Sequence, residues 1–314
     1  MPARLVLRRL LMLFPVLLGM SVVSFSLLYL IPGDVVTVIA GAELAPDSEA
    51  AIAIRQRLHL DQPLPAQYLI WIGNVLQGDF GTSLVRGTPV ATEILAHLPV
   101  TLALTVMSLL LSVVVGIPLG VKAAISRGRS ADMLLRLASL FGMAIPTFFA
   151  GVAAVLFFSL FVPSLQLFRS LDFADDFWGS IGTLVLPSVV LSLTAIATIM
   201  RYTRGAMLEV LNEQFIATAR AKGASPTRVL IRHALRTALL PVITASGLIA
   251  AQLVSGVVVV EQIFGLPGLG QLMLSAISSR DYTMVQGCVI VVGAMVVLIN
   301  LAVDMAYHLL DPRI

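Results

Sequence analysis

Charged side chains are scarce in this sequence: aspartate, glutamate, lysine and arginine together make up 12% of its 314 residues. Soluble domains carry about 25% charged residues, and a water-exposed surface cannot be built from half that amount. Hydrophobic residues reach 58% of the chain. The composition therefore excludes an ordinary soluble protein and indicates a chain that lies largely in lipid.

The sequence also has few cysteines and histidines, and it lacks the motifs that hold metals or nucleotides. The single cysteine, Cys288, excludes an internal disulfide and a metal-binding cysteine cluster. The four histidines are scattered without a His-Glu-x-x-His pair, and the acidic residues show no metal-ligand spacing. The sequence also lacks a Gly-x-x-x-x-Gly-Lys-Ser/Thr loop for nucleotide phosphates. We expect neither a membrane-embedded enzyme nor a cofactor bound by this chain.

Long stretches without any charged residue dominate the sequence. A helix of ~20 apolar residues crosses the ~30 Å hydrocarbon core and bonds its own backbone groups. Stretches of this length lie at residues 10–33, 94–121, 137–168, 177–200, 237–260 and 282–303. A shorter uncharged stretch at 62–78 contains prolines and amides, which suggests an interfacial or packed helix. We therefore predict an all-α membrane protein with six transmembrane helices.

The first stretch also needs comparison with a secretory signal peptide, because Arg4, Arg8 and Arg9 precede it. The apolar part of a signal peptide usually has ~7–15 residues and ends at a small-residue cleavage site. The stretch 10–33 is long enough to span a bilayer and ends in Ile-Pro-Gly-Asp. We expect a retained helix.

Lysine and arginine fall mainly on one side of the predicted membrane. With six spans both termini share a side, and that side collects fifteen of the twenty basic residues. Cytoplasmic loops carry the excess of basic residues in membrane proteins. We therefore predict that both termini are cytoplasmic.

Two connections between the spans are too long to be simple turns. The external segment 34–93 is rich in turn residues and is expected to form a small cap, whereas the internal segment 201–236 holds seven basic residues. We accordingly divide the chain into two parts. Residues 1–93 form the first transmembrane helix with its external cap, and residues 94–314 form a five-helix core with the internal segment.

The internal segment has the pattern of two helices joined by a glycine. Apolar residues recur every three or four positions over 207–222, and Gly223 follows as a helix end. Ser225-Pro226 then provides a hydroxyl cap with proline at the first helical position. A second helix is expected to run to about Leu235, before Pro241 marks the entry into the next span.

This segment has two interpretations. A basic loop that only sets topology gains about 1 kcal/mol per basic residue from anionic lipid. The other interpretation is a docking element for a cytoplasmic partner, which the ordered caps favour because lipid attraction requires no defined helix pair. Arg228, Arg232 and Arg236 lie at every fourth position of the second helix and would be available to either contact.

Short motifs follow one another along the whole chain, at residues 32–34, 58–64, 78–83, 116–120, 215–225 and 260–270. The last of them reads Val-Glu-Gln-Ile-Phe-Gly-Leu-Pro-Gly-Leu-Gly. Together they resemble the permeases of binding-protein-dependent ABC importers, specifically the B-type subunit of the dipeptide/oligopeptide branch. The resemblance implies a type I ABC importer permease fold in a bacterial plasma (inner) membrane.

The resemblance also implies partners. These are a second, non-identical permease, two cytoplasmic ATPase subunits that use ATP and Mg²⁺, an extracytoplasmic substrate-binding protein and the lipid membrane, with no nucleic acid. A coupling helix from Ala224 to about Arg236 would lie in a cleft of one ATPase. The expected coupling residues are Ala217, Ala219, Gly223, Ala224, Ser225, Pro226, Arg228 and Arg232.

One feature departs from the general permease motif, which begins Glu-Ala-Ala six positions before the glycine. Here those positions are Ala217, Thr218 and Ala219, so the acidic residue is missing. A salt bridge from that position to the ATPase is therefore not expected, although the coupling role is.

Polar residues of the span 237–260 and its outer end could line the translocation path. Ser246, Gln252 and Ser255 are the candidates within the span, although ordinary helix packing explains such residues equally well. Glu261 lies at the outer end, where a fully buried acid would be costly. It could contact substrate or binding protein, or serve as a plain interfacial cap.

The cargo and the energy source leave alternatives open. The resemblance indicates di- or oligopeptides, but relatives also carry glutathione, nickel complexes and other small solutes. A self-sufficient secondary transporter usually places ionisable residues in the middle of its spans. None of the six uncharged stretches contains an acid or a base at its centre, which disfavours that class.

Overall fold

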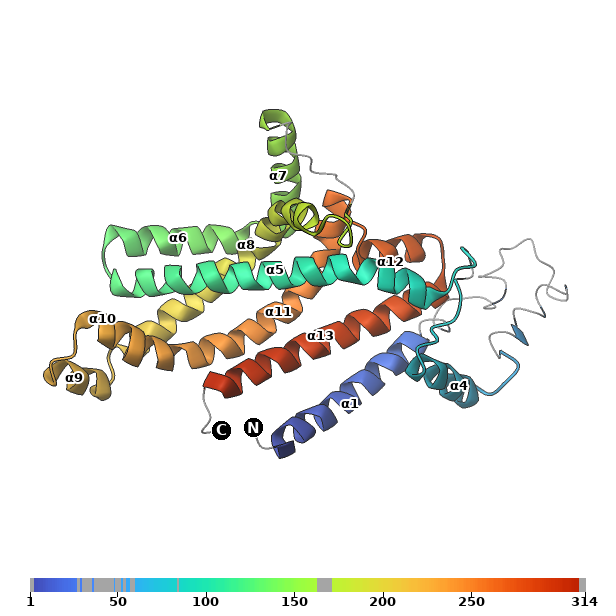
Figure 1. The fold of residues 1–314 in the computed structure, drawn as a ribbon, viewed down its shortest axis with the longest axis horizontal. Coiled ribbons are helices and arrows are strands. Elements are labelled where there is room, and N and C mark those ends of the chain that lie inside the picture. Colours follow the sequence, from blue (N-terminus) through green and yellow to red (C-terminus); the bar gives the residue numbers. More distant parts are fainter. Residues whose placement is uncertain are drawn as a thin grey trace. The chain divides into compact units, whose positions relative to one another are not determined.

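The computed structural model describes residues 3–26, 60–83, 85–162 and 171–310, with isolated positions 29, 36, 48, 52, 55 and 56. Over these residues the regular structure is helical (Figure 1). The helices are α1 (Ala3–Ser26), α4 (Leu64–Leu76), α5 (Val90–Ile125), α6 (Ser130–Ala144), α7 (Thr147–Phe161), α8 (Phe177–Val210), α9 (Gln214–Ala221), α10 (Pro226–Arg228), the π-helical segment η1 (Val229–Leu235), α11 (Arg236–Phe264), α12 (Leu269–Ser278) and α13 (Tyr282–Leu310).

Four described helical runs are long and apolar enough to cross a membrane: Val90–Ile125, Phe177–Val210, Pro226–Phe264 and Tyr282–Val303. The pair α6 and α7 adds a fifth if it is counted as one broken span. The predicted first span, 10–33, extends past the described part of α1, where Phe14–Ser26 is a shorter apolar helix. An all-helical membrane protein is confirmed, while the count of six spans stays a prediction.

The predicted third span, 137–168, is not one straight helix. Helix α6 starts earlier, at Ser130, and α7 leaves it at an angle of 98°. The break falls at Ile145, which is extended (φ −78°, ψ 117°), and at Pro146. Proline forces the preceding residue out of the helical conformation, and that explains the bend. Positions 163–168 lie outside the described residues.

The chain forms two compact units, and residues 100–266 with 298–314 make up the larger one. Helix α8 packs against α6 and α11 there, around a buried apolar cluster that includes Leu104, Leu184, Leu253 and Phe264. Helix α5 approaches α8 closely at Gly120, where an added Cβ would lie 2.6 Å from the Met200 carbonyl oxygen. Small residues permit such close helix packing in lipid.

Residues 1–99 with 267–297 make up the other unit. Its apolar core joins the start of α5 to α12 and α13, and it contains Val90, Leu272 and the fully buried Cys288. In the same unit, the Ser83 hydroxyl donates a buried hydrogen bond to the Asp281 carboxylate. The described end of the external segment therefore packs against α12 and α13, while the cap expected over 34–93 stays a prediction.

Candidate functional site

The internal segment forms a helix–turn–helix, which we call the insert and define as residues 214–236. Helix α9 ends at Ala221 with Lys222 as its C-cap, and Gly223 follows with φ +77°, a conformation that glycine adopts without a Cβ penalty. The Ser225 hydroxyl then accepts a hydrogen bond from the Arg228 amide at 3.4 Å. Pro226 occupies the first helical position. The predicted glycine turn and hydroxyl cap are confirmed.

The predicted helix over 207–222 is wrong in one respect, because it is two helices. Helix α8 runs to Val210, and α9 starts at Gln214 after a turn in which Glu213 is extended. The Asn212 amide group donates to the Leu208 carbonyl and helps to close the end of α8. The apolar period continues across this turn because residues from both helices enter the same buried cluster. The sequence pattern therefore concealed the break.

The second predicted boundary is also wrong. The helix that starts at Pro226 does not end near Leu235 but continues through η1 into α11 as one run to Phe264. Pro241 lies inside α11 and does not interrupt it. A proline removes one backbone donor, and membrane helices tolerate this loss where neighbouring groups compensate. The insert is thus joined to the membrane helix without a hinge loop.

A buried apolar cluster anchors the insert to the ends of α5 and α8. Ile216 of α9 and Val229 and Ala234 of η1 are at most 2% exposed, and they pack with Met207 of α8 and Ala124 of α5. Burial of this many apolar groups holds the insert as a folded element. A loop whose basic residues served only to set the membrane topology would not require a buried apolar core.

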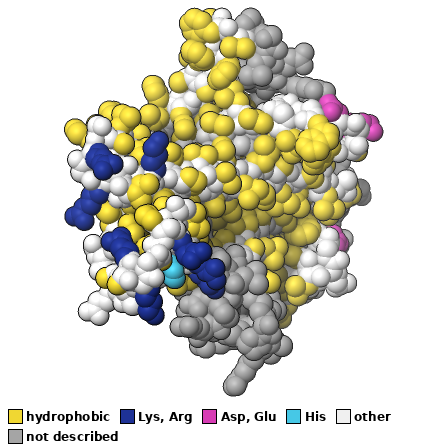
Figure 2. Space-filling view, turned by 60° about the vertical axis from the view of Figure 1, so that its left-hand side comes forward, with side chains coloured by type: hydrophobic (Ala, Val, Ile, Leu, Met, Phe, Trp, Pro, Cys, Tyr) yellow, Lys and Arg dark blue, Asp and Glu magenta, His cyan; other side chains and the backbone are white. Residues whose placement is uncertain are grey.

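The opposite face of the insert is basic and partly apolar. Arg228, Arg232 and Arg236 are exposed, and Ile231 and Phe215 leave 58% and 43% of their surfaces accessible. Figure 2 shows lysine and arginine side chains gathered beside exposed hydrophobic surface. Of the predicted coupling residues, six are exposed and two, Ala219 and Ala224, are half-buried; the exposed ones are Ala217, Gly223, Ser225, Pro226, Arg228 and Arg232.

The predicted pathway residues do not gather on one face of α11. Ser246 is buried and donates to the Val242 carbonyl at 2.8 Å, whereas Gln252 and Ser255 are exposed. Glu261 was expected near an interface, and it is instead fully buried. The Thr101 hydroxyl of α5 donates to its carboxylate at 2.6 Å and offsets part of the cost of burial.

One polar arrangement was not predicted, and we call it the Asp132 cluster. Asp132, at the start of α6, accepts hydrogen bonds from Arg204 of α8 at 2.8 and 3.0 Å and from the Gly128 amide at 3.2 Å. Arg136 adds an ion pair at 3.5 Å. The spacing of Asp132 and Arg136 is visible in the sequence, but the pairing with Arg204, 72 residues away, depends on how α6 packs against α8.

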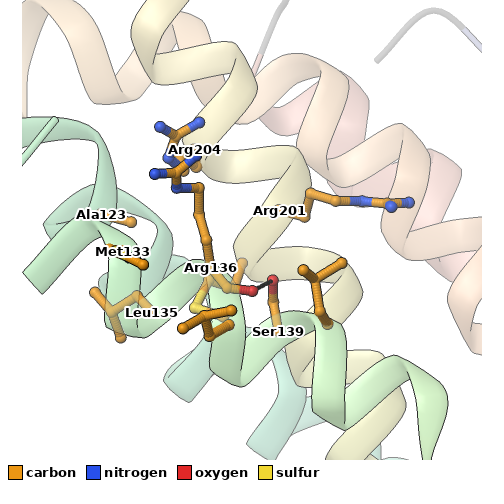
Figure 3. Close-up of a pocket in the computed structure, with 10 residues that line it drawn as sticks. Ala123, Met133, Leu135, Arg136, Ser139, Arg201 and Arg204 are labelled. Atoms are coloured by element: carbon orange, nitrogen blue, oxygen red, sulfur yellow. Dashed lines mark hydrogen bonds between the residues drawn. The ribbon is translucent and has the colours of Figure 1, made fainter. Parts of the chain in front are cut away.

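A cavity of about 420 Å³ adjoins this cluster (Figure 3). Its walls come from the end of α5, from α6 and from α8. They are largely apolar and carry three arginine side chains. The residues are Ala123, Met133, Leu135, Arg136, Leu137, Ser139, Leu140, Met200, Arg201 and Arg204.

Two protein families match the sequence, and together they cover nearly all of it. The family described as "Binding-protein-dependent transport system inner membrane component" matches residues 116–314. Its N-terminal counterpart, "Binding-prot-dependent transport system membrane comp, N-term", matches residues 2–105.

Similar proteins extend over the full length of the chain. A "Probable peptide ABC transporter permease protein y4tP" of Sinorhizobium fredii is 41% identical, and the "Oligopeptide transport system permease protein AppB" of Bacillus subtilis is 40% identical. The "Dipeptide transport system permease protein DppB" of Escherichia coli is 37% identical. Each alignment covers 98% of both chains.

The fold matches a solved structure of an ABC transporter. Inward-facing MetNI, a methionine ABC transporter, has a chain with a TM-score of 0.52 at 21% identity, over 69% of this chain and 96% of that one. This similarity identifies the type I importer permease fold. The matching families are the membrane components of such systems, so the protein is a multi-pass, non-catalytic inner-membrane component. The chain belongs to the ABC transporter permeases of the peptide/oligopeptide (DppB/AppB-like) family.

Proposed function

We propose that this permease carries di- or oligopeptides, forms half of the translocation pathway, and is coupled to an ATPase through the insert. The peptide cargo rests on relatives named for peptide, oligopeptide and dipeptide transport that align over almost the whole chain. The single observation that carries the coupling role is the folded insert, with a buried core on one side and exposed Arg228, Arg232 and Ile231 on the other.

The exposed face of the insert suits a protein cleft. Ile231 offers an apolar contact, while Arg228 and Arg232 flank it in sequence and offer charged contacts. Interfaces commonly combine an apolar centre with arginine. The missing acidic residue at position 217 is compatible with this arrangement, since the proposed contacts use basic and apolar groups.

The continuous helix from Pro226 to Phe264 supports a mechanism for coupling. A displacement of the insert by a closing ATPase dimer would be transmitted along α11, because no flexible loop separates the two. The buried contacts with α5 and α8 would make the neighbouring helices follow. Access to the pathway would then change by rigid-body movement.

The proposed topology has six spans with both termini in the cytoplasm. The described helices and the excess of basic residues on one side support it. Residues 1–93 would contribute the first span and an external cap that receives the loaded binding protein, and residues 94–314 would form the five-helix core. A second permease, two ATPase subunits and a binding protein complete the proposed complex, as the family implies.

The residues that would line the pathway divide into two groups. Gln252 and Ser255 are exposed on α11 and available to a passing solute. Ser246 and Glu261 are buried, so in this conformation we assign them to helix packing, with Glu261 fastening α11 to α5 through Thr101.

The coupling proposal is tested by reversing charges on the insert. In the reconstituted complex, Arg228→Glu/Arg232→Glu should lower ATPase recruitment and the stimulation of ATP hydrolysis by loaded binding protein. Gly223→Pro should do the same, because proline cannot adopt φ +77°. Arg127→Glu/Arg129→Glu, on an exposed turn outside the insert, is the matched control. If the insert variants recruit the ATPase and respond to the binding protein as the unmodified protein does, the insert only sets the membrane topology.

A further inference from the structure

The cavity beside the Asp132 cluster lies where three uncharged stretches of the sequence meet charged residues. The stretch 94–121 stops just before Lys122, the stretch 137–168 begins after Arg136, and the stretch 177–200 stops before Arg201. The cavity is lined by Ala123 of α5, by six residues of α6 between Met133 and Leu140, and by Met200, Arg201 and Arg204 of α8. This coincidence places it at the boundary between the hydrocarbon core and the charged surface, on the side that we predict to be cytoplasmic.

The cavity carries more positive than negative charge. Arg136, Arg201 and Arg204 line it, and the Asp132 carboxylate beside it pairs with two of them. In Figure 3 Arg136 and Arg204 reach toward each other from α6 and α8, whereas Arg201 extends away from this pair. Arg136 keeps 55% of its side chain exposed, so its guanidinium can take a further anionic partner.

The remaining wall is apolar and open. Met133, Leu137 and Leu140 all belong to α6, and each is more than 40% exposed. Leu137 and Leu140 belong to the uncharged stretch 137–168, and Met133 lies one helical turn before it. A hydrocarbon chain would cover these side chains and remove them from water if the cavity opens to the bilayer.

We propose that this cavity binds one phospholipid with an anionic headgroup. Its phosphate lies against Arg136, with Arg201 adding positive charge at the mouth, and an acyl chain lies along Met133, Leu137 and Leu140. Basic pockets between membrane helices on the cytoplasmic side suit such headgroups. Arginine is suited to phosphate because its planar guanidinium presents several donors at once.

The shape of the site favours a lipid over other anions. Inorganic phosphate would satisfy the arginines but gain nothing from three exposed apolar side chains. An acidic protein segment would leave the same side chains uncovered unless it were itself amphipathic. A phospholipid fits both halves of the cavity, and it would fasten α6 to α8 beside the buried ion pair.

The site is tested by titrating the purified complex, in nonionic detergent, with phosphatidylglycerol and with phosphatidylcholine of the same acyl chains, using native mass spectrometry. We expect preferential binding of phosphatidylglycerol. Arg136→Gln/Arg201→Gln should weaken this binding roughly 30-fold, from about 1 kcal/mol per basic residue at a lipid surface. Arg127→Gln/Arg129→Gln, which removes the same charge from a nearby turn, should leave the affinity within twofold.

A second variant separates the headgroup from the chain. Leu137→Gln keeps every arginine but removes part of the apolar wall, and it should also weaken phosphatidylglycerol binding. Arg136→Gln/Arg201→Gln should fold, because Arg204 keeps both hydrogen bonds to Asp132; an unchanged melting temperature without added lipid checks this.

Four results would overturn the proposal. The first is equal binding of the two lipids, and the second is an unchanged affinity in the double variant. The third is displacement of phosphatidylglycerol by an equal concentration of inorganic phosphate, which would indicate a simple anion site. The fourth is efficient cross-linking of Arg201→Cys to another subunit, which would indicate a protein interface. Each readout is independent of ATPase coupling.

Discussion

The insert and the Asp132 cluster both carry arginine in the same unit of the protein, yet they hold it differently. In the insert, Arg228 and Arg232 project from an apolar core into the surroundings. In the cluster, Arg204 is mostly buried and holds a buried carboxylate at 2.8 Å. The exposed arrangement leaves charge available to a partner, whereas the buried one joins two helices of the same chain. Arginine near a membrane therefore has to be interpreted from its partners and not from its position in a loop.

Removing Arg204 should give the largest loss of stability. Arg204→Gln would leave the Asp132 carboxylate, which is 1% exposed, without its two strongest donors. We expect the largest fall in melting temperature among these variants, measured in detergent. Adding Asp132→Asn should recover part of the loss, because the buried charge is then gone. Arg136→Gln is the control, and an equal fall in that variant would contradict the assignment.

Closing the contact between α5 and α8 should have the next largest effect. In Gly120→Ala the new methyl group would meet the Met200 carbonyl oxygen and the Thr203 side chain, each at 2.6 Å. Overpacking of this kind costs about 1–3 kcal/mol. Gly182→Ala in α8, where the Cβ would meet nothing within 4 Å, should change the free energy of unfolding far less. Equal effects in a denaturant titration would show that the close approach is not required.

Loss of the Ser225 cap should have a smaller, local effect. Ser225→Ala removes the side-chain acceptor at the start of the second helix of the insert and should cost about 1 kcal/mol. Faster hydrogen exchange of the amides near Arg228 would measure it. Ser225→Asn, which retains an acceptor, should exchange like the unmodified protein. Uniformly slow exchange in the alanine variant would mean that the cap is dispensable.

Changing an outward arginine should have the smallest effect on stability. Arg228→Gln replaces an exposed side chain, so the free energy of unfolding should shift by no more than about 0.5 kcal/mol. The same variant should nevertheless retain less ATPase on co-purification. A loss of stability as large as that of Arg204→Gln would erase the distinction between the two regions.

Local features of the insert could be predicted from the sequence because they depend on neighbouring residues. Gly223 and Ser225 are separated by one residue, and each specifies its own backbone geometry. The bend at Pro146 had a local cause as well, but the charge-free stretch around it hid the break. By contrast, the end of α8 at Val210 was concealed by an apolar period shared by two helices.

Long-range polar contacts could not be predicted, because no spacing rule connects them. Asp132 and Arg204 meet through the packing of α6 on α8, and the buried Glu261 receives a hydrogen bond from Thr101 of α5. The cost of burying a charge suggested an exposed position for Glu261. The hydrogen bond from Thr101 shows that a partner from another helix can make a buried position acceptable.

Peptide import coupled to ATP is tested most directly in proteoliposomes that contain the complete complex. Uptake of a radiolabelled dipeptide, delivered by its binding protein, should require ATP on the ATPase side. It should fall to background in Arg228→Glu/Arg232→Glu and persist in Arg127→Glu/Arg129→Glu. Dipeptide accumulation that continues without ATP, or that is unaffected by charge reversal on the insert, would contradict the account.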